Sequence, residues 1–118
     1  MNRLVVVAAL LGAGLFPSLS FAGRVPGPGT VCDTVGAFRT DVYTEWFRGG
    51  EIATVVVSGD GDTDLDVFVY DEYGTLVAWD TGYTDDCLVV WRPRWTGPFR
   101  IKVVNRGSFY NRYVLATN

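Results

Sequence analysis

The sequence predicts an all-β protein, an antiparallel β-sandwich of about seven to eight strands. Short runs of β-branched and aromatic residues recur roughly every ten residues, and clusters of glycine, proline, aspartate and asparagine separate them. No segment beyond the N-terminal apolar run has the capped periodicity of an amphipathic helix. We therefore expect strands over residues 40–47, 51–58, 65–70, 75–79, 86–91, 98–105 and 110–117.

Two local patterns refine the order of these strands. Val55, Val56 and Val57 form a run that is apolar on both faces, which suits a central strand of a sheet. Gly49 and Gly50, which precede that run, are typical of a hairpin turn. We therefore expect residues 40–47 and 51–58 to form a hairpin.

The tryptophans divide into two groups. Trp46, Trp79 and Trp91 fall within or at the ends of expected strands, where large aromatic side chains usually fill the space between two sheets. Trp95 lies beside Pro93 in a basic loop, and we expect it to be exposed.

The first 22 residues have the features of a signal peptide. Arg3 precedes an apolar run over residues 4–15, and the small residues Ser20 and Ala22 suit a cleavage site after Ala22. The apolar run is too short to cross a bilayer comfortably. We therefore expect an exported protein without a membrane span, in the periplasm or outside the cell.

Two further segments follow the signal peptide. Residues 23–36 begin with alternating glycine and proline, without periodicity, and we expect them to be a flexible leader. Residues 37–118 are the right length for one small domain, which we expect to be monomeric.

The charge of the chain limits the classes of partner that it is expected to bind. The formal net charge is −3, which disfavours binding to nucleic acid or to an anionic membrane. Acidic residues dominate residues 60–86, and basic residues dominate the last third of the chain. The basic residues there are Arg92, Arg94, Arg100, Lys102, Arg106 and Arg112.

The composition also argues against catalysis. The chain has no histidine, which excludes Ser-His-Asp and Cys-His nucleophiles and histidine-ligated zinc. Asp85 and Asp86 are adjacent, and neighbouring residues of a strand point to opposite faces, so they would not act as an acid–base pair. The two cysteines, Cys32 and Cys87, are expected to form a disulfide in an exported protein, and the alternative is a free reactive pair. We therefore expect a protein that is not an enzyme.

An acidic run is the strongest candidate for a site. Its carboxylates occupy every second position and lead into the expected strand 65–70; they are Asp60, Asp62, Asp64 and Asp66. Close carboxylates repel one another unless a cation or water separates them, and oxygen ligands suit calcium. Loops at the same end of a sandwich would allow Asp80, Asp85 or Asp86 to join such a site. The alternative is a tight turn in which these side chains accept hydrogen bonds from backbone N–H groups.

A second candidate site is a basic loop. Arg92, Arg94 and Trp95 place two guanidinium groups and an aromatic ring in a segment stiffened by Pro93. Such a loop suits a polyanion, a peptide carboxylate or the face of a sugar. The alternative is a solvated basic turn with Trp95 packed against the sheet.

Several of these segments together resemble the bacterial pre-peptidase C-terminal (PPC) domain family. The matching residues are Gly50-Glu51, Val55–Val57, Gly59–Asp71, Gly74–Ala78 and Trp95–Asn105, with Tyr113 close behind. The resemblance runs from about residue 38 to the end of the chain. It implies a jelly-roll β-sandwich similar to collagen-binding modules of collagenases, and a non-catalytic module that aids secretion or substrate contact.

The resemblance and the composition together predict a function. We expect an exported, non-catalytic binding module, stabilised by calcium if the acidic run binds it, with a polysaccharide or protein ligand in the envelope or outside the cell. In the PPC family the module usually follows a peptidase, and no peptidase precedes it in this sequence. The alternative is therefore a secreted adaptor or inhibitor that acts on a separately encoded peptidase or other hydrolase.

Overall fold

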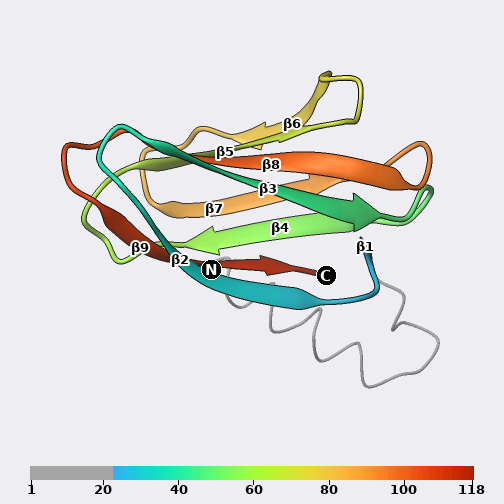
Figure 1. Ribbon diagram of the computed structural model, residues 1–118, viewed down its shortest axis with the longest axis horizontal. Helices are drawn as coiled ribbons and strands as arrows, with labels where there is room; N and C mark the ends of the chain where they lie inside the picture. The colour runs from blue at the N-terminus through green and yellow to red at the C-terminus, as the bar shows by residue number, and fades with distance from the viewer. Residues whose placement is uncertain (1–22) are drawn as a thin grey trace.

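The computed structural model describes residues 23–118, and these form two packed antiparallel β-sheets (Figure 1). The predicted signal peptide, residues 1–22, lies outside the described residues. The strands are β1 (Arg24–Val25), β2 (Gly29–Val35), β3 (Thr40–Phe47), β4 (Ala53–Ser58), β5 (Leu65–Tyr70), β6 (Leu76–Asp80), β7 (Asp86–Trp91), β8 (Gly97–Asn105) and β9 (Asn111–Thr117).

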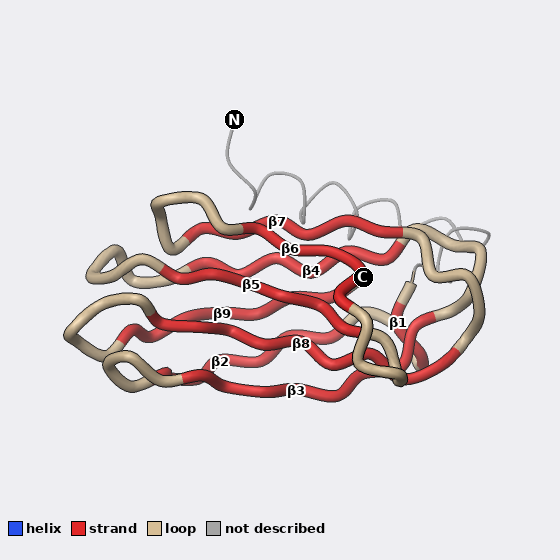
Figure 2. Tube along the Cα trace, turned by 90° about the horizontal axis from the view of Figure 1, so that it is seen from above, coloured by secondary structure: helices blue, strands red, loops and turns tan. Residues whose placement is uncertain are grey.

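The strand order confirms the predicted β-sandwich of jelly-roll type. One sheet has the order β1-β3-β8-β5-β6 and the other has the order β2-β9-β4-β7. From β2 to β9, successive strands lie in different sheets, with the exception of β5 and β6, which are neighbours in one sheet. The connections therefore cross between the sheets repeatedly at the two ends of the sandwich (Figure 2). Leaving β1 aside, this is the eight-stranded arrangement of a double Greek key.

The hydrophobic core lies between the sheets, where alternate residues of each strand point inward. In β8, Phe99, Ile101 and Val103 are buried, whereas Arg100 between them is exposed. The run Val55–Val57 is fully buried in β4, which lies between β9 and β7 as expected of a central strand. The period-two pattern of the sequence therefore fixes the inward side of β8, whereas β4 is apolar on both faces.

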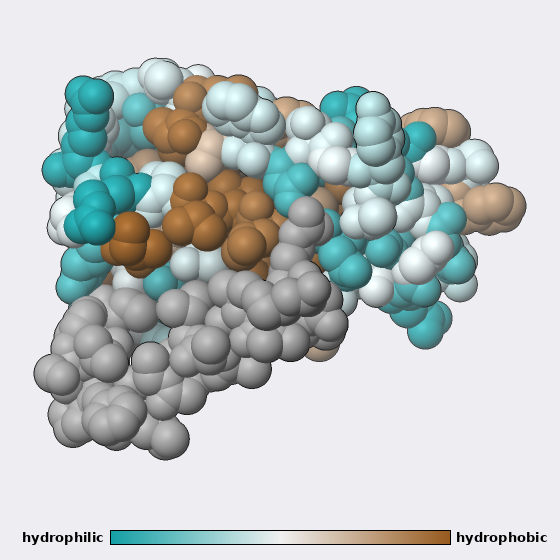
Figure 3. Space-filling view, turned by 180° about the vertical axis from the view of Figure 1, so that it is seen from behind, coloured by the Kyte–Doolittle hydropathy of each residue, from teal (hydrophilic) through white to brown (hydrophobic). Residues whose placement is uncertain are grey.

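The sandwich is closed along one side by the edge strands β6 and β7, which pack against one another. The molecule seen from behind has a group of apolar side chains there, within a mostly hydrophilic surface (Figure 3). The exposed apolar residues of the two strands include Leu76 and Val90. Within residues 23–118, no helix is long and apolar enough to cross a membrane.

Two expectations about the chain path are wrong. Residues 23–36 are not a flexible leader, because they contain β1, which pairs with β3, and β2, which pairs with β9 along seven residues. The prolines that suggested a leader, Pro26 and Pro28, lie between these strands, where no N–H is needed for pairing. Gly49 and Gly50 do not form a hairpin turn either, since β3 and β4 belong to different sheets. Residues 23–36 therefore belong to the sandwich.

The tryptophan prediction is confirmed for two of the four side chains. Trp91 is buried between the sheets, and Trp95 is exposed as expected. Trp46 and Trp79 were expected in the core, but they are 51% and 57% exposed. Both lie on the outward side of their strands, so the period-two pattern outweighs the hydrophobicity of the indole ring.

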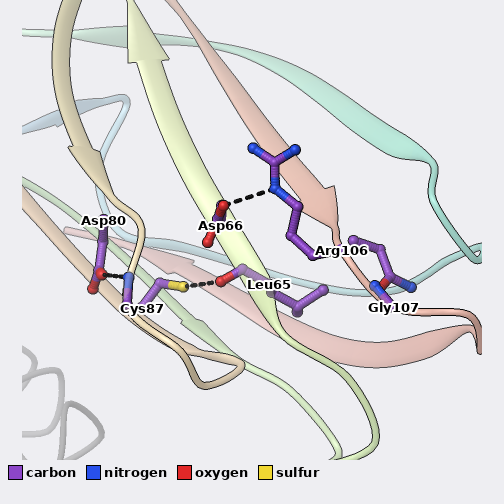
Figure 4. A network of polar contacts seen from close by, with 8 residues as sticks. Leu65, Asp66, Asp80, Cys87, Arg106 and Gly107 are labelled. Carbon is purple, nitrogen blue, oxygen red and sulfur yellow. Dashed lines mark hydrogen bonds and ion pairs between the residues drawn. The ribbon is translucent and has the colours of Figure 1, made fainter.

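The predicted disulfide is also wrong, because Cys32 and Cys87 are not joined. Cys32 is exposed on β2, whereas Cys87 is buried on β7 and its thiol donates a hydrogen bond to the carbonyl oxygen of Leu65 at 3.1 Å (Figure 4). Strands β9 and β4 lie between β2 and β7, which separates the two cysteines by about 14 Å. A disulfide requires Cα atoms within about 7 Å.

The first prediction concerns this geometry. Replacing Cys32 with serine is expected to leave the free energy of unfolding of the purified protein unchanged, because the thiol is on the surface and closes no loop. Chemical denaturation with and without a reducing agent measures it. A loss of roughly 4 kcal/mol, the size expected for opening a long disulfide loop, would contradict the arrangement of β2 and β7.

Candidate functional site

The acidic run forms the connection between β4 and β5, and Asp60 is held by backbone hydrogen bonds. Its carboxylate accepts the N–H of Asp62 at 3.0 Å and the N–H of Arg112 at 3.0 Å. These bonds, that of Arg112 above all, lower the pKa of Asp60. Asp60 therefore closes the turn and ties it to the start of β9, while Asp62 is exposed.

Asp66 leaves the loop and faces outward from β5. One carboxylate oxygen accepts the guanidinium N–H of Arg106 at 2.8 Å, and the Asp66 side chain is 8% exposed (Figure 4). The other oxygen is buried without a hydrogen-bond partner. This ion pair compensates the charge of Asp66 at the base of the loop.

Asp64 is the least favourably placed carboxylate of the four. One of its oxygens is buried and has no hydrogen-bond partner. Burial, reinforced by the nearby charge of Asp66, raises the pKa of Asp64, and the positive charge of Arg106 offsets only part of that shift. The ionised form of Asp64 therefore costs folding free energy.

The residues that lock this loop were not singled out together from the sequence. Asp85 is buried, and its carboxylate accepts the N–H of Gly61 at 2.6 Å and the side-chain amide of Asn111 at 2.9 Å. Asn111 is fully buried, and its side-chain oxygen accepts the N–H of Asp60 at 3.2 Å. Gly59 is required here, because a Cβ atom would lie 2.2 Å from the Asp85 carboxylate. Asparagine is common in turns, so the sequence alone did not indicate that Asn111 would hold this loop.

The acidic residues of neighbouring loops also accept hydrogen bonds from nearby groups of the fold. Asp80 accepts the backbone N–H groups of Gly82 and Leu88, each at 3.0 Å, and Asp86 accepts the Ser58 hydroxyl at 3.2 Å. Within residues 23–118, no group of three or more acidic or cysteine side chains is arranged to hold a metal ion. The geometry favours the turn interpretation, and calcium binding by Asp60, Asp62, Asp64 and Asp66 stays a prediction.

A pair of phenols joins the two sheets: Tyr113 on β9 is buried, and Tyr43 on β3 is half-buried. The two phenol oxygens are in hydrogen-bond contact with one another, and Tyr43 lies 3.0 Å from the Asp33 carboxylate while Tyr113 lies 2.7 Å from the Asp41 carboxylate. Two hydroxyl protons therefore serve three contacts. Burial raises the pKa of Tyr43 to about 12 and the pKa of Tyr113 further. Both phenols therefore stay protonated at neutral pH and act as structural donors.

The basic loop connects β7 to β8 at the opposite end of the sandwich from the acidic run. Arg92 donates to the carbonyl oxygen of Gly50 at 2.6 Å, which ties the loop to the β3–β4 connection. The loop backbone also packs against Gly49, where a Cβ atom would lie 2.5 Å from the Cα of Trp95. The loop is thus anchored at both its start and its end.

Trp95 is oriented by residues of the β5–β6 turn. Its indole N–H donates to Glu72 at 2.8 Å, and its ring meets the ring of Tyr73 edge-on, with centroids 5.8 Å apart. Asp71 shapes that turn by accepting the N–H groups of Tyr73 and Thr75, both at 2.9 Å. Trp95 remains 41% exposed, so part of its ring is available to a ligand. The sequence predicted this turn but did not predict its contact with Trp95.

The basic loop borders a cavity of about 490 Å³. Its apolar lining includes Trp91 and Phe99, and all three predicted binding residues, Arg92, Arg94 and Trp95, are part of its wall. The indole N–H of Trp91 is buried and has no hydrogen-bond partner. A cavity of this size with an apolar floor and a few polar groups is typical of a ligand site. The structure therefore brings the predicted residues together in a cleft, which we call the Trp95 cleft.

The fold is that of the PPC domain. The pre-peptidase C-terminal domain of a Bacillus anthracis collagenase superposes with a TM-score of 0.60, at 17% sequence identity, over 76% of this chain and 88% of that chain. No protein-family model matches the sequence, and no curated protein matches it. The similarity therefore establishes a PPC-like fold and not a shared activity.

Two other solved structures share the fold. The periplasmic g-type lysozyme inhibitor PliG of Aeromonas hydrophila has a TM-score of 0.59 and 15% identity, over 77% of this chain and 84% of that chain. The Yersinia pseudotuberculosis-derived mitogen has a TM-score of 0.56 and 15% identity, over 78% of this chain and 85% of that chain. This jelly roll thus occurs in a collagenase domain, a mitogen and a lysozyme inhibitor.

The second prediction tests the role of the acidic run. Asp64→Asn is expected to raise the melting temperature at pH 7 by about 2 °C, a small change because Asp64 is partly exposed. The pKa of Asp64 is raised by folding, so its ionised form is destabilising above that pKa. The gain should shrink towards pH 3, where the carboxyl is protonated in both states.

The exposed Asp62→Asn is the matched control and should change little. Both variants and the unmodified protein are melted with EDTA and with millimolar calcium. Stabilisation by calcium that is lost in Asp64→Asn, together with a lower melting temperature of that variant, would contradict the turn interpretation and assign a cation to the loop.

Proposed function

We propose that this chain is an exported, non-catalytic binding module with a PPC-like fold, and that it binds its ligand in the Trp95 cleft. The observation that carries the proposal is the cavity itself, which combines an apolar floor with two guanidinium groups. The features of a signal peptide in residues 1–22 support export.

The chemistry of the cleft indicates a ligand with a carboxylate beside an apolar surface. Arg92 and Arg94 offer planar donors that suit a carboxylate, and Trp95 offers an aromatic face. Both a protein side chain or terminus and an acidic sugar satisfy this description. The ligand therefore belongs to the proteins or polysaccharides of the envelope or the surroundings of the cell.

The absence of catalysis is part of the proposal. The sequence has no histidine, and the acidic side chains around the β4–β5 loop accept hydrogen bonds from backbone and side-chain groups of the fold. Hydrolysis by a carboxylate pair needs one acid and one base facing a shared substrate. Asp85 is buried and Asp86 is exposed, so this adjacent pair does not meet that need.

A second candidate function is inhibition of a separately encoded hydrolase. It is favoured by the shared fold of PliG from Aeromonas hydrophila, which is described as an inhibitor of g-type lysozyme. An assay of g-type lysozyme with the purified protein separates the two functions. Inhibition at stoichiometric concentration supports the inhibitor, and full lysozyme activity at excess protein excludes this target.

The third prediction concerns the cleft. Trp95→Ala and Arg94→Ala are each expected to weaken binding at least about tenfold, because a buried aromatic contact and a charge-assisted hydrogen bond are lost. Binding is measured against insoluble peptidoglycan, a collagen-like peptide and immobilised lysozyme. Arg39→Ala, an exposed arginine outside the cleft, is the matched control. Unchanged binding of every retained partner by Trp95→Ala would exclude the cleft as the site.

A further inference from the structure

The outward side of the five-stranded sheet carries aromatic and cationic side chains that the Trp95 cleft does not use. Strands β3, β8, β5 and β6 are neighbours in this sheet, and the alternate residues that do not enter the core point away from it. We call this surface the outer face. It comprises Val42, Trp46, Phe68, Tyr70, Leu76, Trp79, Arg100 and Lys102.

The strand register arranges these residues in two parallel rows. One row crosses the four strands through Val42, Lys102, Phe68 and Trp79, which are successive cross-strand partners. The row spans about 14 Å, because three strand spacings separate its ends. The next row, about 7 Å along the strands, includes Arg100 and its partner Tyr70. Each row thus places one cation beside an aromatic ring.

The positive charge of the outer face is not neutralised. Among the described residues, no ion pair joins Arg100 or Lys102 to a carboxylate. The Lys102 ammonium group lies 4.9 Å from the centre of the Tyr70 ring, which holds it over the sheet. The acidic residue on this side of β5, Asp66, is already paired with Arg106 (Figure 4). A positive, aromatic face on a protein of net charge −3 indicates an anionic partner.

We propose that the outer face binds an acidic polysaccharide chain. Aromatic rings stack on the apolar faces of sugar rings, and guanidinium groups form paired hydrogen bonds with carboxylates. A polymer that repeats both its sugar ring and its carboxylate matches two rows that each repeat an aromatic ring and a cation. A nucleic acid matches this face less well, because two unpaired cations would neutralise few of the phosphates along its backbone.

The outer face and the Trp95 cleft are distinct surfaces of the same strand. In β8, Phe99 points inward to the floor of the cleft and Arg100 points outward. Substitutions on the outer face therefore leave the walls of the cleft in place. The inference does not depend on what the cleft binds.

The fourth prediction tests the outer face with polygalacturonate and its fully methyl-esterified form. These probes share the same sugar backbone and differ in the charge of the carboxyl group. We expect the purified protein to bind polygalacturonate and not the ester, and to bind more weakly as salt rises from about 50 to about 200 mM. Affinity electrophoresis in gels that contain each polymer measures the dissociation constants.

Variants then locate the binding surface. Arg100→Ala and Trp79→Ala are each expected to raise the dissociation constant about tenfold. Arg39→Ala and Tyr83→Ala remove an exposed arginine and an exposed aromatic ring elsewhere, and both should stay within about twofold of the unmodified protein. Melting temperatures confirm that all variants are folded.

Three outcomes would overturn the proposal. Equal binding of the ester would show that carboxylates are not recognised. Loss of binding by Trp95→Ala, with Arg100→Ala unaffected, would move the polymer to the cleft while leaving the proposed function intact. Displacement of polygalacturonate by equimolar single-stranded oligonucleotide, or by poly-glutamate, would assign the face to a different class of polyanion.

Discussion

The packing of Phe47, Trp91 and Phe99 is the contact on which the rest of the structure depends. Phe47 and Phe99 come from the five-stranded sheet and Trp91 comes from the other sheet, with ring centroids 4.9 to 5.9 Å apart. Each pair meets edge-on or tilted, as the quadrupoles of aromatic rings favour. The cluster joins the sheets at the end where the Trp95 cleft opens. Two of these core side chains, Trp91 and Phe99, therefore also form the floor of the proposed site.

Polar side chains impose a second constraint at the ends of the sandwich. A chain that changes sheets at nearly every turn leaves many backbone groups without a strand partner. Three buried asparagines supply partners: Asn105 donates to Gly36 and Phe109, Asn111 bonds the acidic loop, and Asn118 pairs with Thr54 and Ile52. Leaving such a group unsatisfied costs about 1–3 kcal/mol, so each asparagine holds one connection in place.

The strands bounded by turn residues were the most predictable part of this fold. The bounds of β3, β5 and β7 agree with the sequence pattern, because runs rich in β-branched and aromatic residues are bounded by turn residues at both ends. The strands β1 and β2 were not predicted, since glycine and proline dominate their surroundings and their pairing is long-range. The cysteine pairing failed for the same reason, because sheet order is not encoded locally.

The candidate sites were predictable to a similar extent. The residue types of the basic loop indicated binding, but its cleft depends on Glu72 and Tyr73 from a turn distant in sequence. The acidic run indicated either a cation site or a turn, and the choice depends on Asn111 and Asp85, whose contacts arise only in the folded chain.

Strand β8 connects the two proposed surfaces. Its inward residues, such as Phe99, are packed in the core, and its outward residues, such as Arg100 and Lys102, are held at fixed spacing by pairing with β3 on one side and β5 on the other. A ligand on the outer face would therefore order few backbone groups on binding, and only the ends of long side chains would lose freedom. The segregation of basic residues into the last third of the chain has a structural consequence, because β8 places two of them on a rigid surface while the acidic loops occupy other connections.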